Sequence, residues 1–504
     1  MKKIFTVVMI LLFFVAGFSV FGGGQKGVED GAKERIIRVA MNEDLEDFDP
    51  HTDSFMMYRQ VYRHMLYDTL VGYDKDLKME GRLAESWDLK DATTYVFHLR
   101  KGVKFHNGKD FKAEDVKYTF ERVLDVNTGS FLSVDLEPVK EVVVVDDYTV
   151  EVKLKSVAVE FLDNIVTISI VPNDPTLNHR REPIGTGPYK FSEYIANDRT
   201  VFARFEDYWD QDHLLNDGIE FKIIPDEQIA ATNLAGGTVD VLVFVSMAII
   251  DNLKSYPNVK VNMVEETTDI LFFPVNASRK PLDDVRVRRA MAHCFDYEGF
   301  KKVAYKGIGR ITNNPISPSM FAYKDVGLHE YDPAKAKQML AEAGYPDGIE
   351  VTIEVLAGYD RYEQMSVVWK DGLEKAGIKT NLNVTEAQVW LDKFVTHNYD
   401  IIINETATRA STFGFFNTSL IGDGLTLWFK NKDEIEAKIR EPNMTIDEAK
   451  RADQYKALQQ WFFDDVPGAF LFYNVPYIYA TTDKLSGITI NAIGDWDFRG
   501  AVFE

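Results

Sequence analysis

Helical and extended patterns alternate along the second half of the chain, and this alternation constrains the fold more than any other feature. Asp332 and Pro333 predict the start of one helix, and Gly344 predicts its end. Periodicity predicts further elements: helices at 285–295, 365–376 and 446–463, and strands at 348–356, 379–384, 399–403 and 468–473. Strands that alternate with helices form layered α/β structures. We therefore predict an α/β fold.

The first half of the chain is richer in predicted strands and hairpins. Residues 36–40 predict the first strand, and apolar residues alternate from 94 to 100. Asn107-Gly108 is typical of a tight turn, and two apolar runs flank Asp146-Asp147. A helix is predicted at 113–124. With 504 residues, the chain has room for about three domains of ordinary size.

The N-terminus has the pattern of a secretory signal peptide. Lys2 and Lys3 precede an apolar run of 18 residues, 4–21, and glycines follow at 22–24. That length also reaches the lower limit for a membrane-spanning helix. The polar, glycine-rich linker at 23–35 favours cleavage instead, which we expect after Gly22. We therefore expect an exported, periplasmic protein, without a cysteine-linked lipid near this junction.

Charge and cysteine content exclude several classes of protein. The formal net charge is −22, so the chain lacks the basic surface that neutralises nucleic-acid phosphates. The one cysteine, Cys294, excludes internal disulfides and cysteine-based metal sites. It follows Ala290 and Met291 at helical spacing, which predicts a buried packing residue.

Motifs of catalysis are absent from the sequence. We find no phosphate-binding loop, no G-x-S-x-G segment and no H-E-x-x-H segment. We therefore expect no enzyme activity, no cofactor and no metal site. Paired acids such as Glu265-Glu266 would suit a glycosidase, but such pairs arise by chance among 79 acidic residues. An exported glycan hydrolase is kept as an alternative from another functional class.

Aromatic residues beside polar groups mark possible ligand contacts. Tyr359, Trp390 and Phe413 lie in or near predicted loops. Aromatic rings with adjacent hydrogen-bonding groups suit a largely apolar cleft that orients its ligand through a few polar contacts. The alternative for each ring is an ordinary place in the core.

Several segments, in order along the chain, carry a resemblance to a known family. They are Leu66-Tyr67-Asp68-Thr69-Leu70-Val71, Leu83-Ala84-Glu85-Ser86-Trp87, residues 94–108 with 111–116, Gly185-Thr186-Gly187-Pro188-Tyr189, residues 285–290, and Tyr331-Asp332-Pro333 with residues 343–348. Together they resemble the solute-binding proteins of ABC importers in the oligopeptide, dipeptide and nickel class. The resemblance covers almost everything after residue 36.

The resemblance implies two α/β lobes that are joined by a two-strand hinge and enclose the ligand. Lobe I is expected at 36–268 plus 477–504, with an extra subdomain at about 71–170, and lobe II at 269–476. Hinge closure around a ligand is an established mode of domain motion. The resemblance also implies a non-enzymatic binding component, which captures a small solute and delivers it to the permease and ATPase subunits of an importer. We expect a monomer that binds no nucleic acid.

One segment of lobe II departs from the peptide-binding pattern of that family. Peptide-binding members commonly carry an aspartate after the strand equivalent to 400–403, and it pairs with the α-amino group of the peptide. Here Arg409 falls at or near that position, and a fixed cation repels an ammonium group. Glu405 remains an alternative acid four residues away. The ligand is therefore expected to be peptide-like, with an oligosaccharide as the alternative.

We predict that Arg409 faces the cleft and donates hydrogen bonds to the ligand, the alternative being a surface ion pair with an acid such as Glu405. The complete set of expected ligand-binding residues is Phe48, Met56, Tyr359, Trp390, Asn404, Glu405, Thr406, Arg409 and Phe413.

Overall fold

The computed structural model describes residues 35–504 except 46, 53–55, 76, 313, 315, 407–410, 418–431 and 466–468. For residues 56–60, 406, 465 and 469–473 only the backbone is described. The predicted signal peptide, and the predicted linker up to residue 34, lie outside the described residues. Within the described part of the chain, no helix has both the length and the apolar content needed to cross a membrane.

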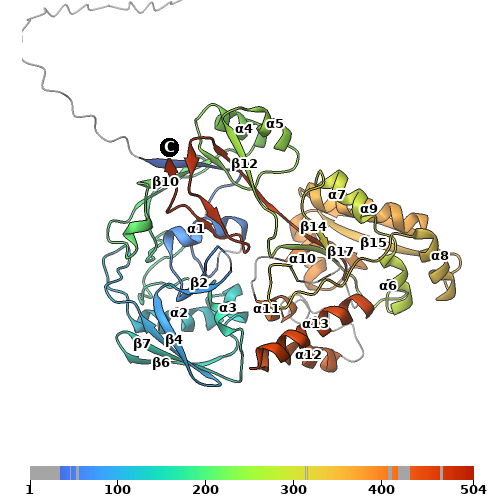
Figure 1. The fold of residues 1–504 in the computed structure, drawn as a ribbon, viewed down its shortest axis with the longest axis horizontal. Coiled ribbons are helices and arrows are strands. Elements are labelled where there is room, and N and C mark those ends of the chain that lie inside the picture. The colour runs from blue at the N-terminus through green and yellow to red at the C-terminus, as the bar shows by residue number, and fades with distance from the viewer. Residues whose placement is uncertain are drawn as a thin grey trace, which may run out of the picture. The chain divides into compact units, whose positions relative to one another are not determined.

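The structure has two lobes, and the first is built on a seven-stranded mixed sheet (Figure 1). Its strand order is β12-β20-β11-β1-β10-β9-β8. The strands are β1 (Ile36–Met41), β8 (Tyr189–Ile195), β9 (Arg199–Arg204), β10 (Gly218–Ile223), β11 (Val241–Leu242), β12 (Val259–Val264) and β20 (Tyr477–Thr482). The helices of this part are α1 (Met56–Leu66), α4 (Glu227–Ala235) and α5 (Ile250–Ser255). Strand β1 pairs in parallel with both β10 and β11.

A second sheet in lobe I is antiparallel and has its own core. Its order is β4-β5-β7-β6, with β4 (Ala84–Asp91), β5 (Thr94–Leu99), β6 (Val139–Asp146) and β7 (Thr149–Leu154). Helices α2 (Ala113–Leu124) and α3 (Phe161–Ile165) and the small sheet of β2 (Val71–Tyr73) and β3 (Met79–Gly81) belong to the same part. Phe97, Phe105 and Phe120 are fully buried here, because the apolar face that alternates along β5 packs against α2 and its neighbours.

Lobe II contains two further sheets. One has the order β14-β19-β13-β18, with β13 (Ile270–Pro274), β14 (Arg310–Thr312), β18 (Asn404–Thr406) and β19 (Ala469–Asn474). The other is parallel, β16-β15-β17, with β15 (Ile349–Leu356), β16 (Ile378–Thr385) and β17 (Ile401–Ile402). Its core includes Trp369, whose ring centroid lies 4.7 Å from that of Phe273, and the fully buried Cys294.

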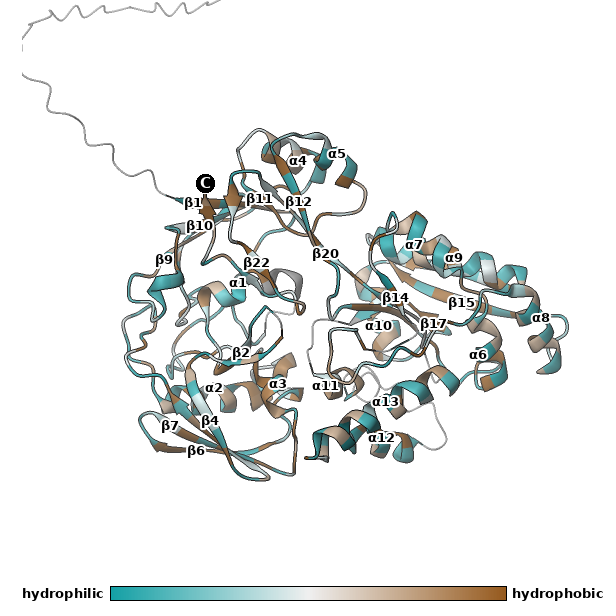
Figure 2. Ribbon diagram, viewed as in Figure 1, coloured by the Kyte–Doolittle hydropathy of each residue, from teal (hydrophilic) through white to brown (hydrophobic). Residues whose placement is uncertain are grey.

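Helices surround the sheets of lobe II. They are α6 (Val285–Ala292), α7 (Tyr297–Ala304), α8 (Pro333–Glu342), α9 (Asp360–Lys375), α10 (Ala387–Val395), α11 (Thr412–Phe416), α12 (Lys432–Arg440) and α13 (Glu448–Asp465). Asp332 caps α8 as its sequence predicts, since its side chain accepts a hydrogen bond from the Lys335 amide at 2.9 Å. Figure 2 shows hydrophilic stretches along outer helices such as α8 and α12.

Short elements complete the chain. They are the strands β21 (Leu485–Ser486), β22 (Thr489–Ile490), β23 (Trp496–Asp497) and β24 (Val502–Phe503), and 3₁₀ turns at Phe131–Val134, Gln211–His213 and Pro442–Met444.

The chain passes from the seven-stranded sheet to the β14-β19-β13-β18 sheet between β12 and β13, and it returns between β19 and β20. Asn474 joins the two crossings, because its Nδ2 donates to the carbonyl oxygens of Thr267 at 2.6 Å and of Asp269 at 3.2 Å. The Thr267 hydroxyl in turn donates to the Val475 carbonyl at 2.5 Å. We propose the lobe limits accordingly, at 268/269 and 476/477, with a subdomain at about 71–170.

Glu160, immediately before α3 in lobe I, is bound by three donors of lobe II, an arrangement we call the Glu160 contact. Ser411 Oγ donates to Oε2 at 2.8 Å, the Phe413 amide donates to the same oxygen at 2.9 Å, and the Tyr455 hydroxyl donates to Oε1. The Glu160 amide also donates to Asn443 Oδ1 at 3.0 Å. Glu160 has an exposed fraction of only 6%, so its charge is satisfied by the opposite lobe and not by water.

Candidate functional site

Polar groups from both lobes meet around Tyr477, the first residue of β20 after the crossing. Burial raises the pKa of this tyrosine well above its ordinary value, and the charges of Asp269, Glu405 and Asp495 add to the effect. Glu405 belongs to lobe II, whereas Asp495 lies between β22 and β23 of lobe I. Charged side chains of the two lobes therefore come near one another in the region around Tyr477.

On the lobe I side, Asp495 is held by two basic residues of α1. Arg63 forms an ion pair with Asp495, and His64 Nε2 lies 2.9 Å from its Oδ2. Burial alone would raise the pKa of Asp495, but the charges of Arg63 and His64 outweigh it and hold the pKa below the ordinary value. This carboxylate is therefore ionised and already paired.

Aromatic rings pack next to Asp495 in lobe I, among them Trp496, which is buried in the core of that lobe. The ring centroid of Trp496 lies 5.3 Å from that of Tyr479 and 6.2 Å from that of Phe244. Phe244 has φ of +54°, in the left-handed region that side chains other than glycine, asparagine and aspartate rarely adopt. Backbone strain of this kind concentrates at ligand sites, because it must be maintained by the surrounding structure.

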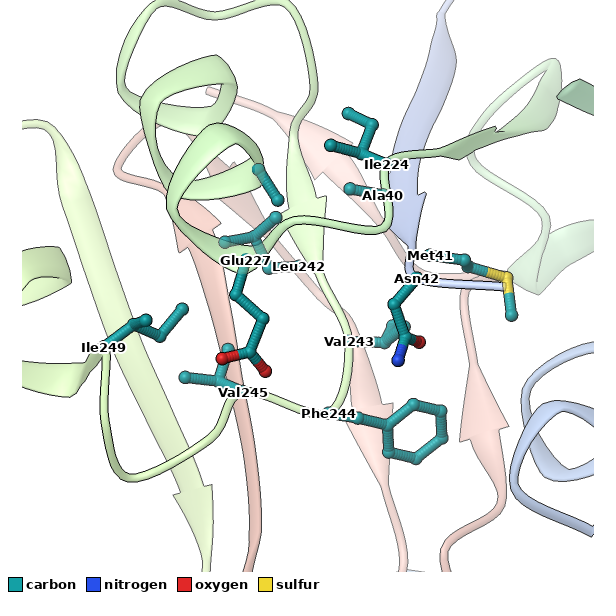
Figure 3. A pocket seen from close by; sticks show the side chains of 11 residues that line it. Ala40, Met41, Asn42, Ile224, Glu227, Leu242, Val243, Phe244, Val245 and Ile249 are labelled. Carbon is teal, nitrogen blue, oxygen red and sulfur yellow. The ribbon is translucent and has the colours of Figure 1, made fainter. Parts of the chain in front are cut away.

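A small pocket lies beside Phe244, between the sheet of lobe I and α4 (Figure 3). Its lining residues are Ala40, Met41, Asn42, Ile224, Glu227, Ala230, Leu242, Val243, Phe244, Val245 and Ile249. The free volume is about 30 Å³, enough for one or two water-sized groups but not for a whole peptide. It can hold one end of a ligand.

On the lobe II side, Glu405 of β18 is paired with Arg361 of α9. Arg361 Nη2 and Nε lie 2.7 Å and 2.9 Å from Glu405 Oε2. Burial alone would lower the pKa of Arg361, but the adjacent carboxylate raises it above the ordinary value. The Arg361 guanidinium lies 5.2 Å from the ring centroid of Tyr359 and 5.3 Å from that of Tyr362, so two aromatic faces also hold the cation.

Besides Glu405, two of the sequence-predicted residues in lobe II, Tyr359 and Asn404, lie next to a member of this ion pair. Tyr359 is the residue before α9, and its ring stacks on Tyr362 with centroids 5.1 Å apart. Asn404 lies opposite Phe272 in the pairing of β18 with β13, next to Glu405. Trp390 of α10 is 9% exposed and stacks on Phe394, so it packs mainly within lobe II.

Two of the predicted residues, Phe48 and Phe413, are buried, and the side chain of a third, Met56, is not described. Phe48 is 2% exposed and packs against Tyr62, Phe191, Tyr194 and Phe202. It lies in the core of lobe I, so we leave it out of the proposed site. Phe413 is also buried, and its backbone amide forms part of the Glu160 contact. Met56 begins α1, and its side chain is not described.

Two predicted residues fall at the end of β18 or beyond it. Thr406 is opposite Ile270 in the sheet, with only its backbone described. Arg409 lies outside the described residues. The partner expected for Arg409 in its surface alternative, Glu405, is occupied by Arg361.

Sequence reasoning did not find Arg361, Tyr477, Asp495 or the Glu160 contact. Arg361 carried a weak signal, because it lies two residues from Tyr359, which was selected as a ligand-contacting ring. Glu160 carried none, since its partners are more than 250 residues away along the chain. Among the described side chains, no group of three histidine, cysteine, aspartate or glutamate residues is placed to hold a metal ion.

Comparisons with known proteins agree with this two-lobed arrangement. The model of the bacterial extracellular solute-binding proteins, family 5, matches residues 78–424. The heme-binding protein A of Haemophilus influenzae is 30% identical over 453 residues, which cover 80% of each chain. The dipeptide-binding protein of Escherichia coli is 27% identical over 469 residues, 84% of this chain and 86% of that protein. A dipeptide-binding protein from Pseudoalteromonas sp. SM9913, solved with Met-Leu, has a TM-score of 0.81 at 23% identity, covering 93% of this chain and all of that one.

Proposed function

The chain belongs to the bacterial extracellular solute-binding proteins of family 5, and from this membership we propose that it binds a peptide between its lobes and delivers it to an ABC importer. Its partners are then the permease and ATPase subunits of that importer. The role is binding and release, without chemical conversion of the solute. The matching proteins give no support to the oligosaccharide or hydrolase alternatives.

The observation that carries this proposal is the meeting of both lobes around Tyr477. Glu405 and Arg361 come from lobe II, while Asp495 and Phe244 come from lobe I. A ligand that touches both sets bridges the hinge, and its binding free energy then favours the arrangement in which the lobes are together. Alternating charged and aromatic surfaces suit a peptide, which offers charged termini, amide groups and apolar side chains.

A ligand screen by thermal unfolding tests the proposal. A ligand that binds only the folded protein stabilises it by about 2.7 kcal/mol at a concentration 100 times Kd. We expect clear increases in Tm with di- to pentapeptides and none with α- or β-linked oligosaccharides. Mass spectrometry of each sample after incubation should recover the peptides intact. Stabilisation by oligosaccharides alone, or turnover of any compound above background, would contradict the proposal.

Three further features belong to the same proposal. We propose export to the periplasm with removal of residues 1–22, and a monomeric protein. The family is described as extracellular, and the N-terminal pattern is that of a cleaved signal. N-terminal sequencing of the protein secreted by a bacterial host should begin at residue 23, and light scattering should give the mass of one chain.

Arg409 remains a proposed ligand contact. Its place four residues after Glu405 supports this, because Glu405 is an acid of lobe II whose charge acts on Tyr477. Arg409→Ala should weaken binding of the best peptide from the screen by about 10-fold or more, as expected for hydrogen bonds to a charged donor. Unchanged affinity, with a change in stability below about 1 kcal/mol, would assign Arg409 to a surface ion pair.

A further inference from the structure

The carboxylates near Tyr477 differ in whether a cationic side chain already pairs with them. Asp495 is paired with Arg63 and His64. Glu405 is paired with Arg361. Asp269 is 8% exposed and lies close enough to Tyr477 to raise the pKa of that residue. Two of these three acids are therefore already paired with cations, and the third, Asp269, is buried.

Glu227 is differently placed, because it lines the pocket beside Phe244. Its Oε2 accepts a hydrogen bond from Ser246 Oγ at 2.5 Å, while within the described part of the chain Oε1 has no hydrogen-bond or ion-pair partner. Figure 3 shows its side chain reaching from α4 toward the loop that carries Val245 and Phe244. The described lining includes neither lysine nor arginine, so no cationic side chain in the pocket pairs with Glu227.

The position of this pocket in the sheet is typical of a ligand site. Strands β10, β1 and β11 run parallel, and their carboxyl ends lead to Ile224, Asn42 and Val243, all of which line the pocket. The chain passes from β10 through α4 to β11, with β1 between them. In open α/β sheets, ligands bind at the carboxyl ends of strands where the connections diverge in this way. The strained backbone of Phe244 lies at the same edge.

We propose that Glu227 is the acceptor for a primary ammonium group of the bound solute, and that this small pocket on lobe I is its subsite. The inference rests on the proposed peptide-binding function and deepens it. An ammonium group has the size of a water molecule, which fits a free volume of about 30 Å³. Its three donors match a carboxylate oxygen in a mainly apolar pocket, where charge-assisted hydrogen bonds are short and strong. The ammonium is either the peptide N-terminus or a lysine side chain.

The test uses the full-length mature protein and a pooled tripeptide library, before and after N-acetylation of the α-amino groups. Native mass spectrometry counts the peptides captured by the wild type, by Glu227→Gln and by Glu298→Gln. Glu298 is the matched control, since it lies in the first turn of α7 as Glu227 lies in the first turn of α4. Unlike Glu227, Glu298 is exposed to solvent. Thermal unfolding of the three proteins checks that each is folded.

We expect Glu227→Gln to capture free tripeptides about 10- to 100-fold more weakly than the wild type, with Glu298→Gln unchanged. If the ammonium is the peptide N-terminus, acetylation abolishes capture by the wild type. If it is a lysine side chain, the wild type selects lysine-containing members of the acetylated library.

Two outcomes separate this inference from the proposed function. Equal capture of free tripeptides by the wild type and Glu227→Gln would overturn the Glu227 subsite while leaving peptide binding intact, as would wild-type capture of acetylated peptides that lack lysine. Capture of neither library by the wild type would overturn peptide binding itself, and the subsite with it.

Discussion

At the scale of single residues, the ion pair with Arg361 determines what Glu405 can still bind. Glu405 is the acid that the sequence offered for binding an ammonium group, yet Arg361 donates to its Oε2 from both Nη2 at 2.7 Å and Nε at 2.9 Å. The pair is partly buried, with side-chain exposed fractions of 31% and 15%. An acid engaged in this way orients its neighbours and has little net charge left to attract a ligand.

Removing the cation should therefore cost stability. We expect Arg361→Ala to lower the free energy of unfolding by about 1–3 kcal/mol, because Glu405 is left half-buried without its donor. Urea denaturation at pH 7 measures the change. The control is Arg279→Ala, which breaks the more exposed pair with Asp400 and should cost less than about 1 kcal/mol. Equal losses in the two variants would show that the Arg361 pair has no special role.

Asp163 should make the stability of lobe I depend on pH. Burial, followed by the charge of Glu160, raises its pKa to about 7, while the hydrogen bond from Tyr73 and the charge of Arg451 act in the opposite direction. Tyr95 is a further ionisable group that faces it. Between pH 4 and pH 7 the folded protein thus holds a proton that the unfolded chain releases.

The free energy of unfolding should fall as pH rises through this interval, with a contribution from Asp163 of at most about 1.4 kcal/mol per pH unit. Asp163→Asn removes the titrating group, so its stability should depend less steeply on pH. Urea denaturation of both proteins at pH 4.5, 6 and 8 measures the two slopes. Parallel slopes would contradict the assignment.

At the scale of single elements, the contact between α9 and the end of α6 depends on one glycine. A Cβ atom at Gly372 would overlap the carbonyl oxygen of Cys294 and lie 2.8 Å from its carbonyl carbon. The obstacle is backbone, which cannot move aside as a flexible side chain can. Gly372 is therefore fixed by packing, although it lies inside a helix where glycine is unfavourable.

Gly372→Ala should destabilise the protein by about 1–3 kcal/mol, despite the better helix propensity of alanine by about 1 kcal/mol. Thermal or urea unfolding gives the sign. Gly236→Ala is the control, because that residue has φ of −79° at the end of α4 and its nearest new contact would be 3.3 Å away. Its effect should stay within about 0.5 kcal/mol. If Gly372→Ala stabilised the protein instead, α9 would have to move away from the backbone of Cys294 without a cost in free energy.

The predictable elements were those whose limits are encoded locally. The helix predicted at 113–124 has those limits as α2, and the capped helix after Asp332 is α8. The strand predicted at 399–403 is reduced to β17, at 401–402, because the carbonyl of Asp400 accepts from the Asn276 amide at 2.9 Å, outside the parallel sheet. Such an end depends on a distant part of the chain, which periodicity does not reveal.

The same distinction holds for the site. The aromatic Tyr359 and the acid Glu405 could be selected because they flank a predicted strand or loop, and both lie at the Arg361 ion pair. Phe48 could not be told from a ligand-contacting ring, since only its four aromatic neighbours place it in the core. Glu227 belongs to an ordinary helix start, and the pocket exists only once β10, β1 and β11 are side by side.

For the whole molecule, the Glu160 contact sets how firmly the lobes hold together. Glu160→Gln replaces a charged acceptor of three hydrogen bonds with a neutral amide, and bonds to a charged acceptor are worth about 1.5–3 kcal/mol each. We expect release of a bound peptide to accelerate at least about 10-fold, and small-angle scattering to give a larger radius of gyration. Glu141→Gln, on an exposed strand of lobe I, is the control. Unchanged release would show that this contact does not hold the lobes together.

Cys294 has a practical consequence for watching these lobes move. It is fully buried, and burial raises the pKa of its thiol to about 12. Maleimide dyes react with the thiolate, so the native protein should remain unlabelled at neutral pH. Cysteines introduced at two exposed acids, Glu114 in lobe I and Glu298 in lobe II, would then accept fluorophores without any need to remove the natural thiol. The wild-type background is thus ready for an optical sensor of its own solute.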